Sequence, residues 1–244
     1  MVERRGEFMN KYQIQLSDLN IEINSHNSFE NEFKKYAISG CKPDIVISAT
    51  DEGFDELIAH FGSVSQRHAE FIALYYLLSQ KLLKFQRMVF HASVLEVDSR
   101  GYAFSAISGV GKTTQTRLWL KYFKDRARVI NGDKPILSFD GDTAYAWGTP
   151  WCGKEGIGIN ASVPLRAVFF IERAEENSIE RLESSDILKK MFFQFFMPKA
   201  GGVGMSELLL LANRLVKCVP MYLLKCNMDI SAVEVAYKKV LSDM

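Results

Sequence analysis

The segment 106–113 (AISGVGKT) constrains this chain more than any other part of its sequence. It has the spacing of a phosphate-binding loop, with alanine at the position of the usual first glycine. Gly109 and Gly111 permit a tight backbone turn in which successive N–H groups point into one concavity. A helix that begins near Lys112 would add its positive end to that anion site. The flanks predict an apolar strand over 102–105 and a helix over 114–122, which together indicate an α/β domain.

The side chains of this loop suit a nucleotide site. The ammonium of Lys112 would contact the outer phosphates, and the hydroxyl of Thr113 would hold Mg²⁺. The residues expected to contact the nucleotide are Ser108, Gly109, Val110, Gly111, Lys112, Thr113 and Thr114. The alternative is a chance match to a degenerate pattern, against which the flanking strand and helix argue.

Charge and composition exclude several classes of protein. The 244 residues are 48% hydrophobic and 24% charged, as in ordinary globular proteins, and the net charge of +1 provides no basic field for nucleic acid. No apolar run is long enough to span a membrane, and the N-terminus lacks the apolar core of a secretory signal. The four cysteines form no CxxC pair. We therefore expect a cytoplasmic protein that binds neither nucleic acid nor membranes.

The pattern along the chain predicts two regions. Residues 1–85 are expected to form a small α+β region, with strands in 11–24 and 44–48 and a last helix over 67–85 that docks on the second region. Residues 86–244 are expected to form the nucleotide-binding domain. Its expected strands are 88–97, 102–107, 128–130, 135–139, 143–147, 166–171 and 220–224, and its expected C-terminal helices are 184–197, 204–217 and 230–241.

Asp133 is the leading candidate for a catalytic carboxylate. It follows the expected strand 128–130 and lies twenty residues after Thr113, where open α/β sheets place their ligand sites. A carboxylate there could bind Mg²⁺ or take the proton from an acceptor hydroxyl. The alternative is a turn aspartate within Asn131-Gly132-Asp133.

Two further side chains are candidates for catalysis. His91 lies on the strand before the loop and could reach the phosphate end of the site, or it could be a packed and hydrogen-bonded core histidine. Lys154 lies between glycines in 148–156 (GTPWCGKEG), which suggests a mobile flap. It could contact the transferred phosphoryl group or an acidic substrate, or it could be a solvated loop lysine.

Taken in order, residues 91–93 (HAS), 106–114, 131–135 (NGDKP) and 148–156 resemble the HPr kinase/phosphorylase family, which is structurally related to phosphoenolpyruvate carboxykinases. Small members of this kind are often found beside peptide-modification genes. The resemblance implies a mixed, largely antiparallel sheet that carries the phosphate-binding loop, or Walker A motif. It also implies binding of ATP with Mg²⁺ and phosphate transfer to a hydroxyl. That family has an Asp-Asp pair after the loop, whereas here Gly132 takes the first place and Asp133 the second.

We therefore expect a kinase that transfers the γ-phosphate of ATP to a serine-type hydroxyl of a peptide or small molecule. Thr113 and Asp133 would hold Mg²⁺, Asp133 with His91 would accept the hydroxyl proton, and Lys154 would close over the transferred group. A nucleotide-binding partner without transfer activity is the alternative that Gly132 favours. A kinase or phosphorylase that uses pyrophosphate is a third. The family's hexamers make a homo-oligomer conceivable here.

Overall fold

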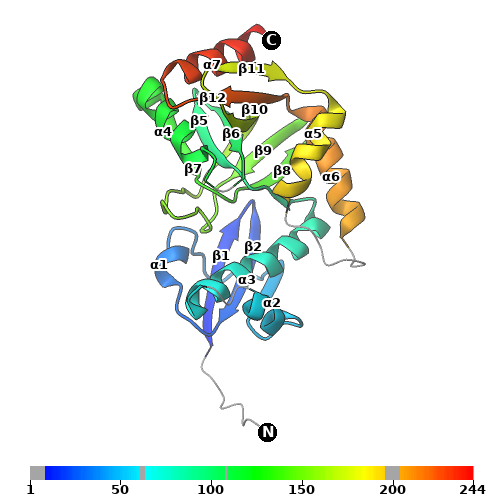
Figure 1. The fold of residues 1–244 in the computed structure, drawn as a ribbon. Coiled ribbons are helices and arrows are strands. Elements are labelled where there is room, and N and C mark those ends of the chain that lie inside the picture. Colours follow the sequence, from blue (N-terminus) through cyan, green and yellow to red (C-terminus); the bar gives the residue numbers. More distant parts are fainter. Residues whose placement is uncertain (1–8, 61–63, 108, 196–203, 244) are drawn as a thin grey trace. The chain divides into compact units, whose positions relative to one another are not determined.

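The computed structural model describes residues 9–60, 64–107, 109–195 and 204–243 (Figure 1). The chain divides into two compact units, Met1–Phe85 and Gln86–Met244. Each unit has its own sheet, of three strands in the first and nine in the second. Among the described residues, no helix has the length and apolar character that crossing a membrane requires.

The first unit is built on a small mixed sheet with strand order β1-β2-β3. The strands β1 and β2 form an antiparallel hairpin, whose turn places Ser17 and Asp18 at φ 46° and 63°. β3 then pairs parallel to β2. The elements of this unit are β1 (Asn10–Leu16), β2 (Leu19–Ser25), α1 (Glu30–Phe33), β3 (Ile45–Ser48), α2 (Phe54–His60), α3 (Gln66–Leu82) and the 3-10 helix η1 (Leu83–Phe85).

The helix α3 is fixed to its own unit by a buried carboxylate. Ser65 caps its first turn by accepting a hydrogen bond from the backbone N–H of His68. Glu70 is only 2% exposed, and it accepts hydrogen bonds from the backbone N–H groups of His26 and Asn27. The predicted strands and helix of this region are confirmed. The docking of α3 on the second unit stays a prediction.

The second unit contains a nine-stranded sheet with order β4-β8-β9-β10-β6-β5-β7, to which β12 adds by pairing with β10, and β11 by pairing with β12. Within the described residues, β10 pairs parallel with β6 and β12, and the other strand pairs of this sheet are antiparallel. The predicted mixed, largely antiparallel sheet is therefore confirmed. Its strands are β4 (Met88–Val89), β5 (Ser93–Val97), β6 (Arg100–Ser105), β7 (Ala127–Asn131), β8 (Ile136–Asp140), β9 (Thr143–Trp147), β10 (Ser162–Arg173), β11 (Ser178–Arg181) and β12 (Met221–Cys226).

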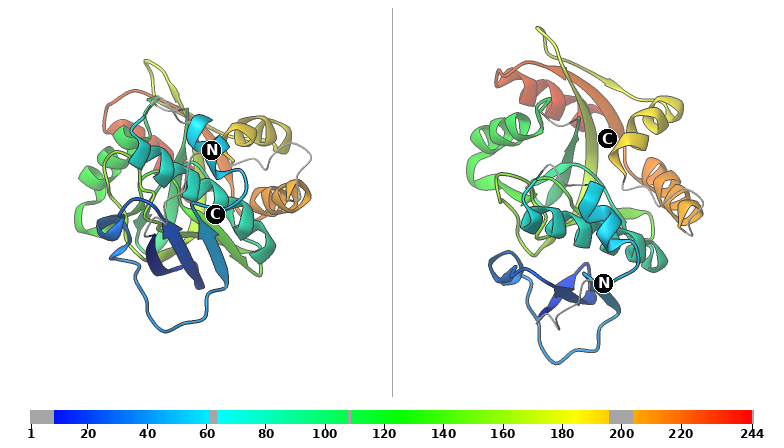
Figure 2. Two further views of the ribbon diagram at one scale, coloured as in Figure 1. Left: turned by 90° about the horizontal axis from the view of Figure 1, so that it is seen from below. Right: turned by 60° about the horizontal axis from the view of Figure 1, so that its bottom comes forward.

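The helices of the second unit gather on two sides of this sheet, and Figure 2 shows α5 and α6 together, away from α4. α4 and α7 share one aromatic core with the central strands, in which Trp119 lies 5.3 Å from Phe104 and 5.7 Å from Phe169 between ring centroids. The helices are α4 (Lys112–Phe123), α5 (Ser184–Met191), α6 (Met205–Cys218) and α7 (Ser231–Ser242), with 3-10 turns η2 (Lys124–Arg126) and η3 (Phe192–Gln194).

Two expectations about the second unit were wrong. The segment 88–97 is not one strand: β4 pairs with β8, whereas β5 pairs with β6 and β7. The break occurs because His91 turns its N–H to the carbonyl of Gln194 instead of to a neighbouring strand. The helix expected over 184–197 ends at Met191 and continues as the 3-10 turn η3, and the end of that range lies outside the described residues.

Candidate functional site

The glycine-rich loop follows β6 at one edge of the sheet. Gly109 and Gly111 have φ angles of 82° and 153°, which L side chains rarely adopt. A Cβ on Gly109 would meet nothing within 4 Å, so glycine is required there by the backbone conformation and not by a lack of space. Ser108, a predicted contact residue, lies outside the described residues.

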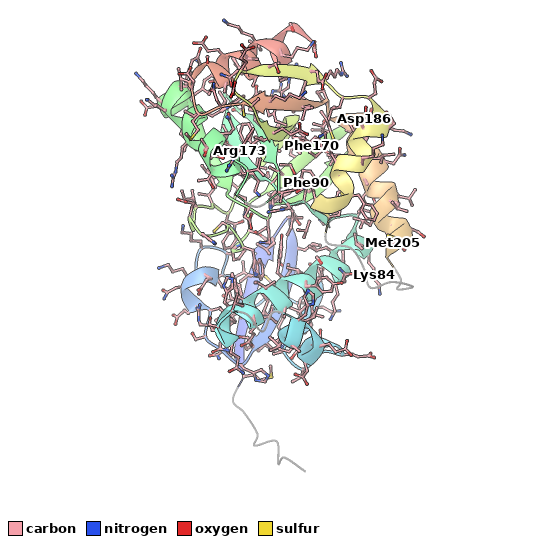
Figure 3. All side chains as sticks on the ribbon, in the orientation of Figure 1. Lys84, Phe90, Phe170, Arg173, Asp186 and Met205 are labelled. Atoms are coloured by element: carbon pink, nitrogen blue, oxygen red, sulfur yellow. The ribbon has the colours of Figure 1, made fainter. Side chains whose placement is uncertain are left out.

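An arginine from the neighbouring strand holds this loop. Arg173, labelled in Figure 3, ends β10 and donates hydrogen bonds to the carbonyls of Gly109 and Val110, the latter from Nε at 3.0 Å. A guanidinium suits this task because it presents several donors in one rigid plane. The sequence alone did not identify Arg173, since the strand pairing that brings it to the loop is not visible in the chain order.

The helix α4 begins directly at the loop, with Gly111 at its N-cap and Lys112 as its first residue. Its first turn contains no acidic side chain, so the positive end of the helix dipole is not offset there. The Lys112 ammonium donates a hydrogen bond to the carbonyl of Ala106 at 3.0 Å. Thr113 is exposed and Thr114 is half-buried. This end of the helix has the chemistry of an anion site.

His91 and Asp133 meet although 42 residues separate them. His91 Nε2 lies 3.1 Å from Asp133 Oδ1, and the Lys134 ammonium donates to Asp133 Oδ2. The backbone explains the meeting, because the N–H of Ala92 donates to the carbonyl of Asp133 at 3.0 Å. His91 and Asp133 are half-buried, with side chains 25% and 18% exposed. His91 is thus a paired histidine at the sheet edge, neither isolated nor enclosed in the core.

The charges of this cluster influence one another. Burial by itself raises the pKa of Asp133, but the hydrogen bonds and positive charges of His91 and Lys134 outweigh it and hold that pKa below its usual range. Burial lowers the pKa of Lys112, the charge of Asp133 raises it, and the charge of Lys134 lowers it. Burial is the largest of these effects, so the pKa of Lys112 lies below its usual range.

A buried amide fixes the turn that presents Asp133. Asn131 is 0% exposed, and its Oδ1 accepts hydrogen bonds from the backbone N–H groups of Asp133 at 2.9 Å and Lys134 at 2.7 Å. Its Nδ2 donates to the carbonyl and the hydroxyl of Thr149, at 3.1 and 3.0 Å. Asn131, Lys134 and Thr149 were not among the side chains expected to form the site. The signal for Asn131 was available, because asparagine at the start of such a turn commonly bonds the backbone two residues on.

The segment 148–158 packs closely against this turn. A Cβ on Gly132 would lie 2.6 Å from the carbonyl oxygen of Cys152, and one on Gly153 would lie 2.9 Å from Asp133 Cβ. This close approach gives a physical reason for glycine at position 132, where the HPr kinase/phosphorylase family, which this sequence resembles, has an aspartate. Lys154 is exposed. The expected flap is limited to the exposed turn around Lys154, because the N–H of Gly132 bonds the carbonyl of Ile157 and anchors the segment.

The strand directions explain why the glycine-rich loop, Asp133 and His91 lie at one edge of the sheet. β7 is antiparallel to β5, and β5 is antiparallel to β6, so β6 and β7 run the same way and end at the same edge of the sheet. The glycine-rich loop follows the first of them and Asp133 follows the second. β5 begins at that edge, two residues after His91. The edge thus combines an anion-attracting helix end with one carboxylate, one imidazole and two ammonium groups.

The oxygen ligands at this edge suit a hard cation better than a soft one. Among the described residues, no group of three His, Cys, Asp or Glu side chains is arranged to hold a metal ion. Magnesium does not require such a group, because it commonly keeps waters and binds through one or two carboxylates together with substrate phosphates. Thr113 and Asp133 carry oxygen atoms of the kind that Mg²⁺ prefers as ligands.

Comparison with known proteins identifies a family and shows similarity to solved structures. A search of the curated proteins finds no match. The solved structure of the Hpr(Ser) kinase/phosphatase from Coxiella burnetii aligns with a TM-score of 0.36 and 11% sequence identity, over 64% of this chain and 93% of that one. The model of the family described as "SynChlorMet cassette protein ScmC" matches residues 62–236, a range that includes the loop, His91 and Asp133. The chain belongs to the ScmC family.

Proposed function

We propose that this protein is an ATP- and Mg²⁺-dependent kinase that transfers the γ-phosphate to a hydroxyl of a peptide or small molecule. The observation that carries the proposal is that Asp133, paired with His91, lies at the same edge of the sheet as the glycine-rich loop that begins α4. Phosphoryl transfer requires an anion cradle, positive charge on the moving group and a carboxylate beside the acceptor. All three requirements have candidates at this edge.

The loop and the start of α4 would bind the donor phosphates. The backbone N–H groups of 109–113 and the positive helix end attract the negative oxygens. Lys112 now bonds the carbonyl of Ala106, and a neutral carbonyl is a weaker partner than a phosphate oxygen. A bound polyphosphate would therefore take over the ammonium.

Asp133 would act on the acceptor hydroxyl or on Mg²⁺. Its lowered pKa makes it an anion at neutral pH, which suits a metal ligand or a group that orients a hydroxyl and receives its proton late. His91 would hold one carboxylate oxygen, leaving the other to Lys134 or to the ligand. With Thr113 and Asp133 as its protein ligands, Mg²⁺ would neutralise charge on the phosphates. Lys154, on its exposed turn, would contact the transferred group.

Removing the ammonium of Lys112 tests the proposal. We expect Lys112→Ala to lose binding of ATP and of tripolyphosphate in calorimetry, and to lose transfer from labelled ATP to a library of hydroxyl peptides. Lys121→Ala is the matched control, because Lys121 is an exposed lysine on the same helix. Unchanged affinity in a folded Lys112→Ala protein would overturn the proposal.

A second variant separates the two roles of Asp133. If Asp133 acts on the acceptor, Asp133→Asn should keep the affinity for ATP with Mg²⁺ and lose transfer. If it binds the metal, the variant should require more Mg²⁺ to bind ATP. Wild-type protein that binds ATP tightly and labels no acceptor would instead support a nucleotide-binding partner without transfer activity, the reading that Gly132 favours. Equal transfer from pyrophosphate and ATP would identify the third alternative.

A further inference from the structure

A hollow of about 330 Å³ lies on the side of the glycine-rich loop opposite Asp133. Its walls come from the loop and the first turn of α4, from the end of β10, and from the segment that follows β12. The His91–Asp133 cluster does not line it. A volume of this size is at the lower end of small-molecule sites.

The order of the strands places the glycine-rich loop between this hollow and the His91–Asp133 cluster. β6, which leads into the loop, pairs with β5 on one side and with β10 on the other. Asp133 follows β7, beyond β5, whereas β12 lies beyond β10. Because β6, β7, β10 and β12 all run in one direction, both features lie at the same sheet edge. A ligand that has its reacting end at Asp133 and crosses the loop would have its other end in the hollow.

The lining of the hollow is mostly apolar with one buried amide. Val110, Ile171 and Ala174 contribute to the walls, beside Met228, which is 79% exposed. Gln115 lines the hollow and is only 1% exposed, yet its Oε1 has no hydrogen-bond partner among the described residues. A buried acceptor without a partner costs free energy, so a ligand that supplies a donor is favoured.

The amide of Gln115 can respond to such a ligand. Its Nε2 donates to the Cys226 sulfur at 3.2 Å, so Oε1 is the amide atom that is left to accept a hydrogen bond from a ligand. Burial raises the pKa of the Cys226 thiol to about 11, which leaves the sulfur protonated and unreactive at neutral pH. Arg173 also lines the hollow, and a guanidinium is a flat group that stacks well on aromatic rings.

We propose that this hollow binds the base of the donor nucleotide, and that Gln115 selects adenine by accepting a hydrogen bond from its exocyclic amino group. The inference rests on the proposed function. Adenine offers the donor that Oε1 lacks, in its exocyclic N6 amino group. Apolar walls and a guanidinium face suit the flat surface of a purine. Inosine triphosphate carries a carbonyl at the position of that amino group, so its oxygen would face the amide oxygen of Gln115.

Calorimetry on the full chain with three probes tests the inference. Tripolyphosphate reports the loop alone, ATP adds the base, and inosine triphosphate adds a base without the amino group. We expect ATP to bind at least about tenfold more tightly than inosine triphosphate, the effect of one hydrogen bond to a buried group. Gln115→Met, which keeps the side-chain volume, should remove that preference and leave tripolyphosphate binding unchanged.

A second variant tests the location independently of Gln115. Ala174→Trp should fill the hollow and weaken ATP binding by about tenfold or more, with tripolyphosphate binding retained. Glu176→Trp, at an exposed position two residues on, is its control. If Gln115→Met does not fold, the Ala174→Trp variant and the wild-type comparison of ATP with inosine triphosphate still show whether the hollow binds the base.

The outcomes separate this inference from the function on which it rests. Wild-type protein that does not bind tripolyphosphate contradicts the phosphate loop itself, and with it the proposed function. If the wild type binds tripolyphosphate, ATP and inosine triphosphate equally, and Ala174→Trp does not change ATP binding, the phosphate-binding loop is supported and the base site is refuted.

Discussion

Replacing Asn131 by alanine should destabilise the second unit more than a typical substitution does. Four hydrogen bonds of the Asn131 side chain disappear, two accepted from backbone N–H groups and two donated to Thr149. For three of these bonds water or another group replaces the lost partner, and the loss of each costs about 0.5–1.5 kcal/mol. The fourth loss leaves the buried carbonyl of Thr149 without a partner, which costs about 1–3 kcal/mol. The total is roughly 2.5–7.5 kcal/mol, against a usual domain stability of about 5–15 kcal/mol.

Urea unfolding followed by tryptophan fluorescence measures this loss in the relevant unit. All three tryptophans, Trp119, Trp147 and Trp151, lie within Gln86–Met244, so the signal reports that unit. Thr149→Val should have a smaller effect of about 1–3 kcal/mol, because it removes the hydroxyl bonds and keeps the carbonyl bond. Asn160→Ala, at an exposed asparagine, should change stability by less than about 0.5 kcal/mol. A loss below about 1 kcal/mol for Asn131→Ala would refute the argument that this amide holds the turn.

Two further predictions concern the same turn. Gly132→Ala should destabilise the second unit by about 1–3 kcal/mol in the same assay, because its Cβ would lie 2.6 Å from the carbonyl oxygen of Cys152. A variant as stable as the wild type would show that the segment 148–158 moves away from the added Cβ without cost. For Asp133, folding lowers the pKa from the ordinary 3.8, so its contribution to stability is fully present above that pH and is lost as the pH falls through the lower folded-state pKa. Urea midpoints of wild type should therefore fall more steeply with acid below about pH 4 than those of Asp133→Asn, and parallel curves would contradict the ionic role of this carboxylate.

The sequence predicted the local elements of the site better than their surroundings. The glycine-rich loop, the helix after it and the carboxylate at the end of a strand follow from short-range rules, because glycine permits the positive φ angles and a helix must begin after the turn. The strands expected over 135–139 and 143–147 are also found, as β8 and β9, which pair antiparallel across the turn at Asp140-Gly141-Asp142. The 3-10 end of α5 and the short strand β11 were not foreseen, since neither has a strong periodic pattern of its own.

Long-range pairing decided the rest. His91 reaches Asp133, and Thr149 reaches Asn131, through hydrogen bonds between segments that are distant in the chain. The split of 88–97 into two strands likewise depends on which neighbour each half pairs with. Local propensity cannot decide such choices, because both halves are equally apolar and suited to a strand.

By itself, the sequence determined that a tight turn with two glycines leads into a helix with lysine at its start, because backbone sterics and the free N–H groups of a first turn leave few other conformations. Only the tertiary structure decided what faces that turn: Asp133 with its imidazole and ammonium partners on one side, and a hollow with a buried amide on the other. The reason is that strand order, which no local residue preference specifies, brings the ends of β7, β10 and β12 to the same edge as the loop.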